Sequence, residues 1–110
     1  MPKMRGKRKD SQIEKLIEEA TVDAYCDDEQ ATGFLTMIQD HLRCPAPARI
    51  VGEEVQVLEF DFRKGGSRIF AKCRRMGEVY WVEATCLEWP GKPPAGAEWI
   101  DAYRVWLVEA

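Results

Sequence analysis

The amino-acid sequence predicts an α+β fold with two N-terminal helices, a small antiparallel meander or half-open SH3-like barrel, and a C-terminal helix. Three observations predict it. Apolar residues recur at helical spacing in the first part of the chain, alternate with polar residues between residues 48 and 83, and return to helical spacing after residue 97. The 110 residues amount to one domain, and the 45% hydrophobic content is typical of a folded protein.

The first helix is predicted to begin at residue 11. Ser11 is a suitable N-cap, and Glu14 completes a capping box three residues later. One apolar stripe follows at helical spacing and consists of Ile13, Leu16, Ile17, Ala20 and Ala24. Residues 1–9 carry five cations and no acid. We therefore expect a disordered basic tail at residues 1–10 and a single domain at residues 11–110.

The second helix is predicted to begin at residues 27–30, because acidic residues favour the first turn of a helix. Its apolar face consists of Phe34, Leu35, Ile38 and Leu42. Gly33 lies inside this helix, where glycine costs about 1 kcal/mol relative to alanine. A close contact with another helix would explain this glycine. Residues 44–47 contain two prolines and are expected to end the helix.

Three or four short antiparallel strands are predicted between residues 48 and 83. Lys64-Gly65-Gly66-Ser67 is a hairpin turn signal, and residues 76–78 form a shorter turn. Because a short meander is not stable alone, the helices should cover it. After a loop at residues 90–94, the last helix is expected at residues 97–107, with Trp99 and Trp106 packed on the sheet.

The charges of the chain are unevenly distributed around a net charge of −3. Residues 10–29 hold eight acids and one cation, whereas residues 63–75 hold six cations and no acid. Phosphate binding needs a clustered positive surface, so an acidic body argues against a general nucleic-acid binder. No apolar run is long enough to span a bilayer, and the N-terminus lacks the apolar stretch of a secretory signal. We therefore expect a cytoplasmic protein that does not bind membranes.

The four cysteines, at positions 26, 44, 73 and 86, form no CxxC pair, so a zinc site is not expected. Without an export signal, disulfides are not expected either, and buried free thiols are the prediction. The only histidine, His41, precedes Cys44 by three residues. Nothing in the sequence supplies a third group that would orient such a pair, so we predict that the protein is not an enzyme.

The acidic residues between positions 19 and 29 are the strongest candidates for a binding site. On a continuous helix, Glu19, Asp23 and Asp27 would form one column, in which like charges repel by about 0.2–0.5 kcal/mol per pair. A bound cation would relieve this repulsion, and Ca²⁺ suits several carboxylate oxygens in flexible geometry. In the alternative reading, Asp27 or Asp28 caps the second helix and the other acids form a solvated face. No EF-hand loop is present.

Four segments together resemble the small cyanobacterial calcium-binding protein family, which lacks EF-hands. They are residues 18–25 (EEATVDAY), 28–38 (DEQATGFLTMI), 51–55 (VGEEV) and 94–103 (PAGAEWIDAY). The resemblance extends over roughly residues 13–107 and implies two helices before a barrel-like sheet. It also implies Ca²⁺ binding at modest affinity through surface carboxylates, which by position are Glu19, Asp23, Asp28 and Glu29. Asp27 is added from the local geometry.

We therefore expect a non-catalytic intracellular Ca²⁺ buffer or sensor. We expect it to be a monomer, and the sequence leaves open a protein partner that it does not identify. An alternative function uses the basic and aromatic sheet face at residues 63–75 to bind nucleic acid or an acidic protein, although nucleic acid is the less expected partner. Its anion-binding residues would be Arg68, Lys72, Arg74 and Arg75. The opposing interpretation places the aromatic rings in the core and the cations on the solvent-exposed face of a strand.

Overall fold

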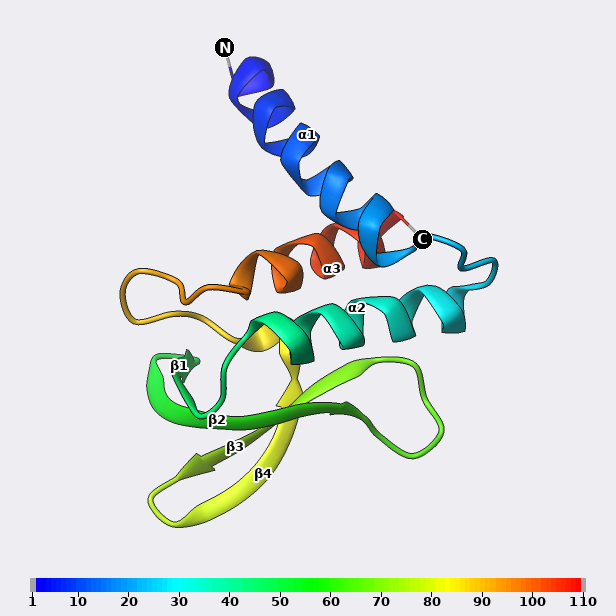
Figure 1. Ribbon diagram of the computed structural model, residues 1–110. Coiled ribbons are helices and arrows are strands. Elements are labelled where there is room, and N and C mark those ends of the chain that lie inside the picture. Colours follow the sequence, from blue (N-terminus) through cyan, green and yellow to red (C-terminus); the bar gives the residue numbers. More distant parts are fainter. Residues whose placement is uncertain (1, 110) are drawn as a thin grey trace.

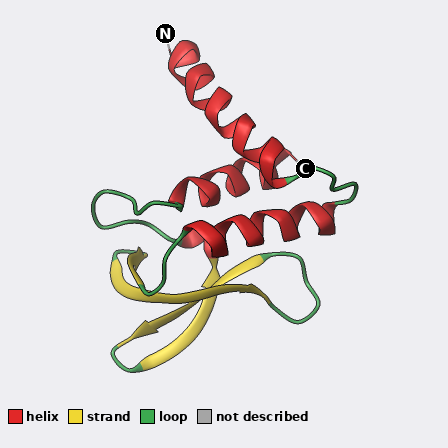
Figure 2. Ribbon diagram, in the orientation of Figure 1, coloured by secondary structure: helices red, strands yellow, loops and turns green. Residues whose placement is uncertain are grey.

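The computed structural model describes the backbone of residues 2–109 and the side chains of residues 11–108. Its elements are, in chain order, α1 (Pro2–Ala20), α2 (Asp27–His41), β1 (Ala46–Ile50), β2 (Glu53–Phe62), β3 (Ile69–Arg75), β4 (Glu78–Glu83), the short 3-10 helix η1 (Ala84–Cys86) and α3 (Ala97–Glu109). Figure 1 and Figure 2 show the helices gathered on one side of a single sheet. The predicted α+β class with a C-terminal helix is confirmed.

The four strands form one antiparallel sheet in the order β1-β2-β3-β4, as a meander should. The sheet is open, because β1 and β4 are its two edges and do not pair with each other. The register between β2 and β3 shifts between Val57 and Glu59, as at a β-bulge, which increases the local bend of a strand. At the outer edge of β1, Arg49 and Glu88 exchange backbone hydrogen bonds of 2.7 and 2.8 Å.

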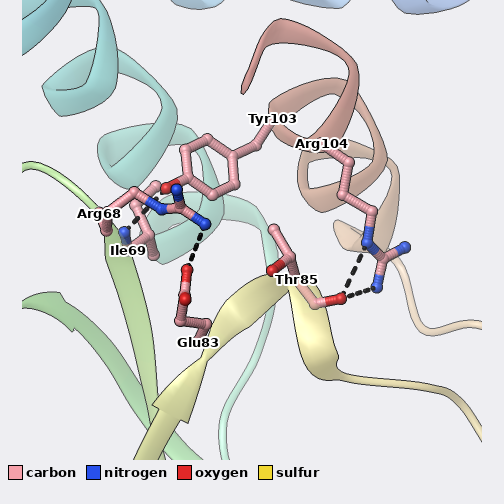
Figure 3. Close-up of polar contacts among 6 residues, drawn as sticks. All are labelled: Arg68, Ile69, Glu83, Thr85, Tyr103 and Arg104. Carbon is pink, nitrogen blue, oxygen red and sulfur yellow. Dashed lines mark hydrogen bonds and ion pairs between the residues drawn. The ribbon is translucent and has the colours of Figure 1, made fainter. Parts of the chain in front are cut away.

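The core lies between the sheet and the helices. Alternate residues of β3, namely Ile69, Ala71 and Cys73, are fully buried, as the pleat of a strand covered on one face requires. From α3, the Tyr103 hydroxyl oxygen accepts a 2.9 Å hydrogen bond from the backbone N–H of Ile69 (Figure 3). Burial raises the pKa of the Tyr103 hydroxyl. This contact links the C-terminal helix to the start of β3.

Helix α1 begins earlier than predicted. It runs from Pro2, so Ser11 lies inside the helix and is not its N-cap. Lysine and arginine are good helix formers, which lets the helix continue through a basic segment. Figure 1 shows the first turns of α1 extending away from the other helices. The predicted basic tail at residues 1–10 falls outside the part of the chain whose side chains are described and stays a prediction.

The two tryptophans of α3 contact side chains of α2 and belong to the core that the helices share with the sheet. The ring of Trp99 stacks on His41, with 5.5 Å between ring centroids. The ring of Trp106 lies 5.4 Å from that of Phe34. Helix α3 lies beside α2 (Figure 1), and this face of α3 is therefore used in helix–helix packing. Over the described residues, no helix combines the length and apolarity needed to cross a membrane.

All four cysteines are free, but only Cys73 is buried. The prediction of buried thiols is wrong for Cys26, Cys44 and Cys86, which are exposed. Cys26 and Cys44 lie in the loops on either side of α2, and Cys86 lies in η1. Such positions are poorly covered by the core, whereas Cys73 lies on the buried face of the β3 alternation.

In the native protein, Cys26 and Cys86 are expected to react readily with a disulfide reagent and Cys44 more slowly, because its pKa is raised, whereas Cys73 is expected to be protected. Burial, and to a smaller degree the charge on Cys44, raises the pKa of Cys73 to about 11, and the thiolate is the reactive form. The number of thiols that react at mildly alkaline pH, counted by absorbance, tests this. The same protein in denaturant provides the control with four reactive thiols. Four rapidly reacting thiols in the native protein would contradict the burial of Cys73.

Candidate functional site

The junction between α1 and α2 carries the acidic residues that the sequence predicts as ligands. Helix α1 ends at Ala20, where Thr21 donates hydrogen bonds from its N–H and its hydroxyl to the Ile17 carbonyl, at 2.9 and 2.7 Å. The chain then reverses, and the Ala24 N–H donates to the Thr21 carbonyl at 3.0 Å. Asp23 has a left-handed backbone, with φ of 61°, which aspartate tolerates better than most residues.

The predicted column of Glu19, Asp23 and Asp27 is not formed. It requires a continuous helix, but the helix stops at Ala20 and the next begins at Asp27. Three carboxylates at i, i+4 and i+8 are therefore divided among the end of one helix, a turn, and the start of another helix. The reversal brings the two helices into contact and buries Ala20, whose relative exposure is 5%.

The first turn of α2 holds Asp27, Asp28 and Glu29, as predicted, because the positive end of the helix dipole favours anions. The N-cap residue is Cys26, with extended backbone and no capping hydrogen bond from its side chain, so neither aspartate is the N-cap. Instead Glu29 Oε1 accepts a 2.9 Å hydrogen bond from the Tyr25 N–H. This hydrogen bond holds the Glu29 side chain against the turn.

The five predicted ligands share two properties. Each is exposed, and none forms an ion pair with a cation among residues 11–108; they are Glu19, Asp23, Asp27, Asp28 and Glu29. Within the described side chains, no three His, Cys, Asp or Glu residues lie in an arrangement that could hold a metal ion. The junction thus offers carboxylates without salt-bridge partners on three short segments, and they are not assembled into a preformed cage.

Gln30 positions the junction, although it was not among the predicted site residues. Its Oε1 accepts a 2.8 Å hydrogen bond from Trp106 Nε1 on α3, and its Nε2 donates to the Ala24 carbonyl at 3.4 Å. The side chain therefore connects the turn, α2 and α3. No local signal marks this role, because the two partners are 76 residues apart in the chain.

The alternative anion-binding residues already have partners on the sheet. Arg68 pairs with Glu83 of β4 (Figure 3). The other three partners lie on β2: Lys72 Nζ is 3.6 Å from Glu59 Oε2, Arg75 Nη1 is 3.3 Å from Glu53 Oε1, and Arg74 Nη2 donates to Gln56 Oε1 at 3.0 Å. Opposite charges therefore face each other across the strands, which lowers the net positive field that an anion would meet.

The environment of the histidine and the nearest cysteine does not resemble an activated nucleophile. The ring of His41 stacks on Trp99. Cys44 is exposed, but partial burial of its thiol and, secondarily, the charge of Glu59 raise its pKa. Activation of a cysteine nucleophile requires the opposite change, a lowered pKa.

Two solved structures share this fold. Anabaena CcbP is 22% identical, with a TM-score of 0.76 over 88% of this chain and 89% of that chain. A calcium-binding protein in its calcium-binding form is 20% identical, with a TM-score of 0.70 over 89% of this chain and 90% of that chain. No protein-family model and no curated protein sequence matches. The fold implied by the sequence resemblance is therefore confirmed, and the chain has the fold of Anabaena CcbP.

Proposed function

We propose that the protein binds Ca²⁺ through the carboxylates of the α1–α2 junction and acts, without catalysis, as an intracellular calcium buffer or sensor. The observation that carries the proposal is a group of exposed carboxylates at this junction, none of them paired with a described cation. The fold supports it, because a protein of the same fold is a calcium-binding protein in its calcium-binding form. The proposed ligands come from Glu19, Asp23, Asp27, Asp28 and Glu29.

The physical chemistry of the junction fits a calcium ion of modest affinity. Ca²⁺ accepts oxygen ligands in variable number and flexible geometry, so it can gather carboxylates that are not preassembled. The two helix dipoles act in opposite directions, because the C-terminal end of α1 attracts a cation and the N-terminal end of α2 repels it. The attraction of the carboxylates must therefore supply the binding energy, and part of it is spent on ordering the turn at Asp23.

The proposed mechanism is charge neutralisation. An ion held between the turn and the first turn of α2 lowers the repulsion among the acids and draws α1 toward α2. Because only the folded chain brings these segments together, binding stabilises the fold by about 2.7 kcal/mol when free Ca²⁺ is 100 times its dissociation constant. The melting temperature should consequently rise with Ca²⁺ concentration.

Replacing both Asp23 and Asp28 with asparagine is expected to weaken Ca²⁺ binding by about tenfold or more, because affinity follows the charge count of the ligands. Each replacement keeps the size of the side chain and removes its charge. The measurement is a calorimetric titration of the metal-stripped protein with Ca²⁺, repeated with Mg²⁺ present. Binding that survives Mg²⁺ is the expected result for the parent protein.

The matched control is Glu78→Gln. Glu78 is an exposed carboxylate on β4, at the hairpin end of the sheet away from the junction (Figure 1). This variant is expected to bind Ca²⁺ as the parent does. Equal losses of Ca²⁺ affinity in the control and in the double variant would mean that the surface charge attracts Ca²⁺ diffusely, without a specific site. No saturable binding to the parent protein would contradict the proposal itself.

A further inference from the structure

The face of the sheet that points away from the helices carries an open hollow of about 430 Å³, lined by Arg63, Lys64, Phe70 and Trp81. The strand pleat explains the two rings. Phe70 lies between the buried residues Ile69 and Ala71 and therefore points to the opposite face. Trp81 is paired with Lys72 across the β3–β4 ladder and lies on that same face. Both rings are half-buried and leave part of their surface in the hollow.

Two cations complete the hollow. The guanidinium carbon of Arg63 lies 4.7 Å from the centroid of the Trp81 ring, a cation–π distance. The following turn is defined by Lys64 at φ 48° and Gly65 at φ 73°, and the Gly66 N–H donates to the Arg63 carbonyl at 3.0 Å. Among residues 11–108, neither Arg63 nor Lys64 forms an ion pair, in contrast to Arg68, Lys72 and Arg75 of the same basic segment.

The nearby carboxylates on this face already accept hydrogen bonds. Glu83, which is opposite Phe70 on β4, pairs with Arg68. Asp61, which is opposite Phe70 on β2, accepts a 2.8 Å hydrogen bond from the Phe62 N–H. The acids of the α1–α2 junction belong to other elements, and at physiological salt the field of exposed charges decays over about 8 Å. An anion at Arg63 and Lys64 therefore meets two donors that have no competing ion pair.

We propose that this hollow binds a nucleoside phosphate, either as a free nucleotide or as one unit of a single strand. The base has two flat surfaces to stack on, the Phe70 ring and the outer face of the Arg63 guanidinium, and bases stack on both kinds of group. The remaining N–H donors of Arg63 and the ammonium group of Lys64 are available for the phosphate. An acidic peptide would use the cations and leave the rings unoccupied, so a ligand with both a base and a phosphate fits better.

The volume of the hollow is compatible with such a ligand, because small-molecule sites commonly measure about 300–1,000 Å³.

The residues of the hollow also differ from the anion-binding residues predicted from the sequence. Arg68, Lys72 and Arg75 have carboxylate partners, whereas Arg63 and Lys64 have none among the described side chains. The proposal does not depend on Ca²⁺ binding at the junction, so the titrations below are performed both with Ca²⁺ and with a chelator.

The test is a titration of the 110-residue protein followed by NMR at the indole N–H of Trp81, assigned with a Trp81→Phe variant. The probes are adenosine 5′-monophosphate, a short single-stranded oligoadenylate, inorganic phosphate and a polyglutamate peptide. We expect a saturable shift with the nucleotide or the oligonucleotide, and about tenfold weaker binding of phosphate, which cannot stack. Saturation by the mononucleotide identifies a free nucleotide as sufficient, whereas saturation by the oligonucleotide alone identifies a single strand.

Arg63→Gln and Phe70→Leu are each expected to lower the affinity by about tenfold, and the second substitution keeps an apolar side chain of similar size. The matched control is Arg74→Gln, which removes a cation of the same sheet that is bonded to Gln56. It should leave the affinity unchanged, and the backbone amide spectrum verifies that each variant is folded. Three outcomes would overturn the proposal. Arg74→Gln could lose as much nucleotide affinity as Arg63→Gln, or polyglutamate could bind as tightly as the nucleotide. The third is the absence of a saturable shift with any probe.

Discussion

The Gly33→Ala variant is expected to be less stable than the parent protein by about 3 kcal/mol, although alanine is the better helix former. A Cβ atom at position 33 would overlap the carbonyl oxygen of Ala20 and lie 3.0 Å from its carbonyl carbon. Both atoms belong to the backbone, so no change of rotamer removes the clash. The end of α1 must move away from α2, and the burial of Ala20 is lost.

The sign of the change makes this prediction decisive. Helix propensity alone predicts that the free energy of unfolding of the variant rises by about 1 kcal/mol. The measurement is the free energy of unfolding from denaturation in urea. Thr36→Ala is the matched control, because Thr36 is exposed on the same helix, and its expected change is within about 0.5 kcal/mol. A Gly33→Ala protein as stable as its parent would contradict the close approach of α1 and α2.

The same contact determines the geometry of the candidate calcium site. Ala20 is the last residue of α1, and the turn that carries Asp23 follows directly. A displaced α1 moves Glu19 relative to the first turn of α2. If the carboxylates of the two helices bind one ion, the Gly33→Ala variant should therefore bind Ca²⁺ more weakly than Thr36→Ala does.

The parts of the fold that the sequence predicted are those set by local periodicity. The alternation in β3 between buried and less buried residues is visible in the sequence, as is the turn at residues 64–67. Gly33 also gave a correct expectation, because glycine inside a helix has a cost that a close contact explains. For α3, periodicity identified the apolar face that carries Trp99 and Trp106 but not the contacts of that face with Phe34 and His41 of α2.

The candidate site was less predictable, because its arrangement depends on contacts between distant segments. The acidic column failed because it required one continuous helix, whereas α1 ends at Ala20 and α2 begins at Asp27. The pairing of Arg68 with Glu83 depends on strand register, and the hydrogen bond between Gln30 and Trp106 depends on helix packing. For the same reason, the difference between Arg68, Lys72 and Arg75, which have carboxylate partners, and Arg63 and Lys64, which have none among the described side chains, appears only in the folded chain.

The Gly96→Ala substitution is expected to lower the free energy of unfolding by about 4 kcal/mol. This is a large part of the roughly 5–15 kcal/mol that stabilises a typical domain. Two effects combine at this position. Gly96 has φ of 96°, which residues with a Cβ atom rarely adopt. A Cβ atom would also lie 2.5 Å from the carbonyl carbon and oxygen of His41 and 2.6 Å from the Leu42 nitrogen. The start of α3 could then no longer approach the end of α2.

Gly52→Ala separates the two effects. Gly52 has φ of 79°, but a Cβ atom there would have no neighbour within 4 Å, so only conformational strain of about 1–2 kcal/mol is expected. The difference in unfolding free energy between the two variants measures the steric contribution of the contact between α2 and α3. Because Trp99 stacks on His41 at this same end of α3, the Gly96→Ala variant should also change tryptophan fluorescence. Equal losses in both variants would mean that strain alone acts at Gly96 and that the helices do not approach each other so closely.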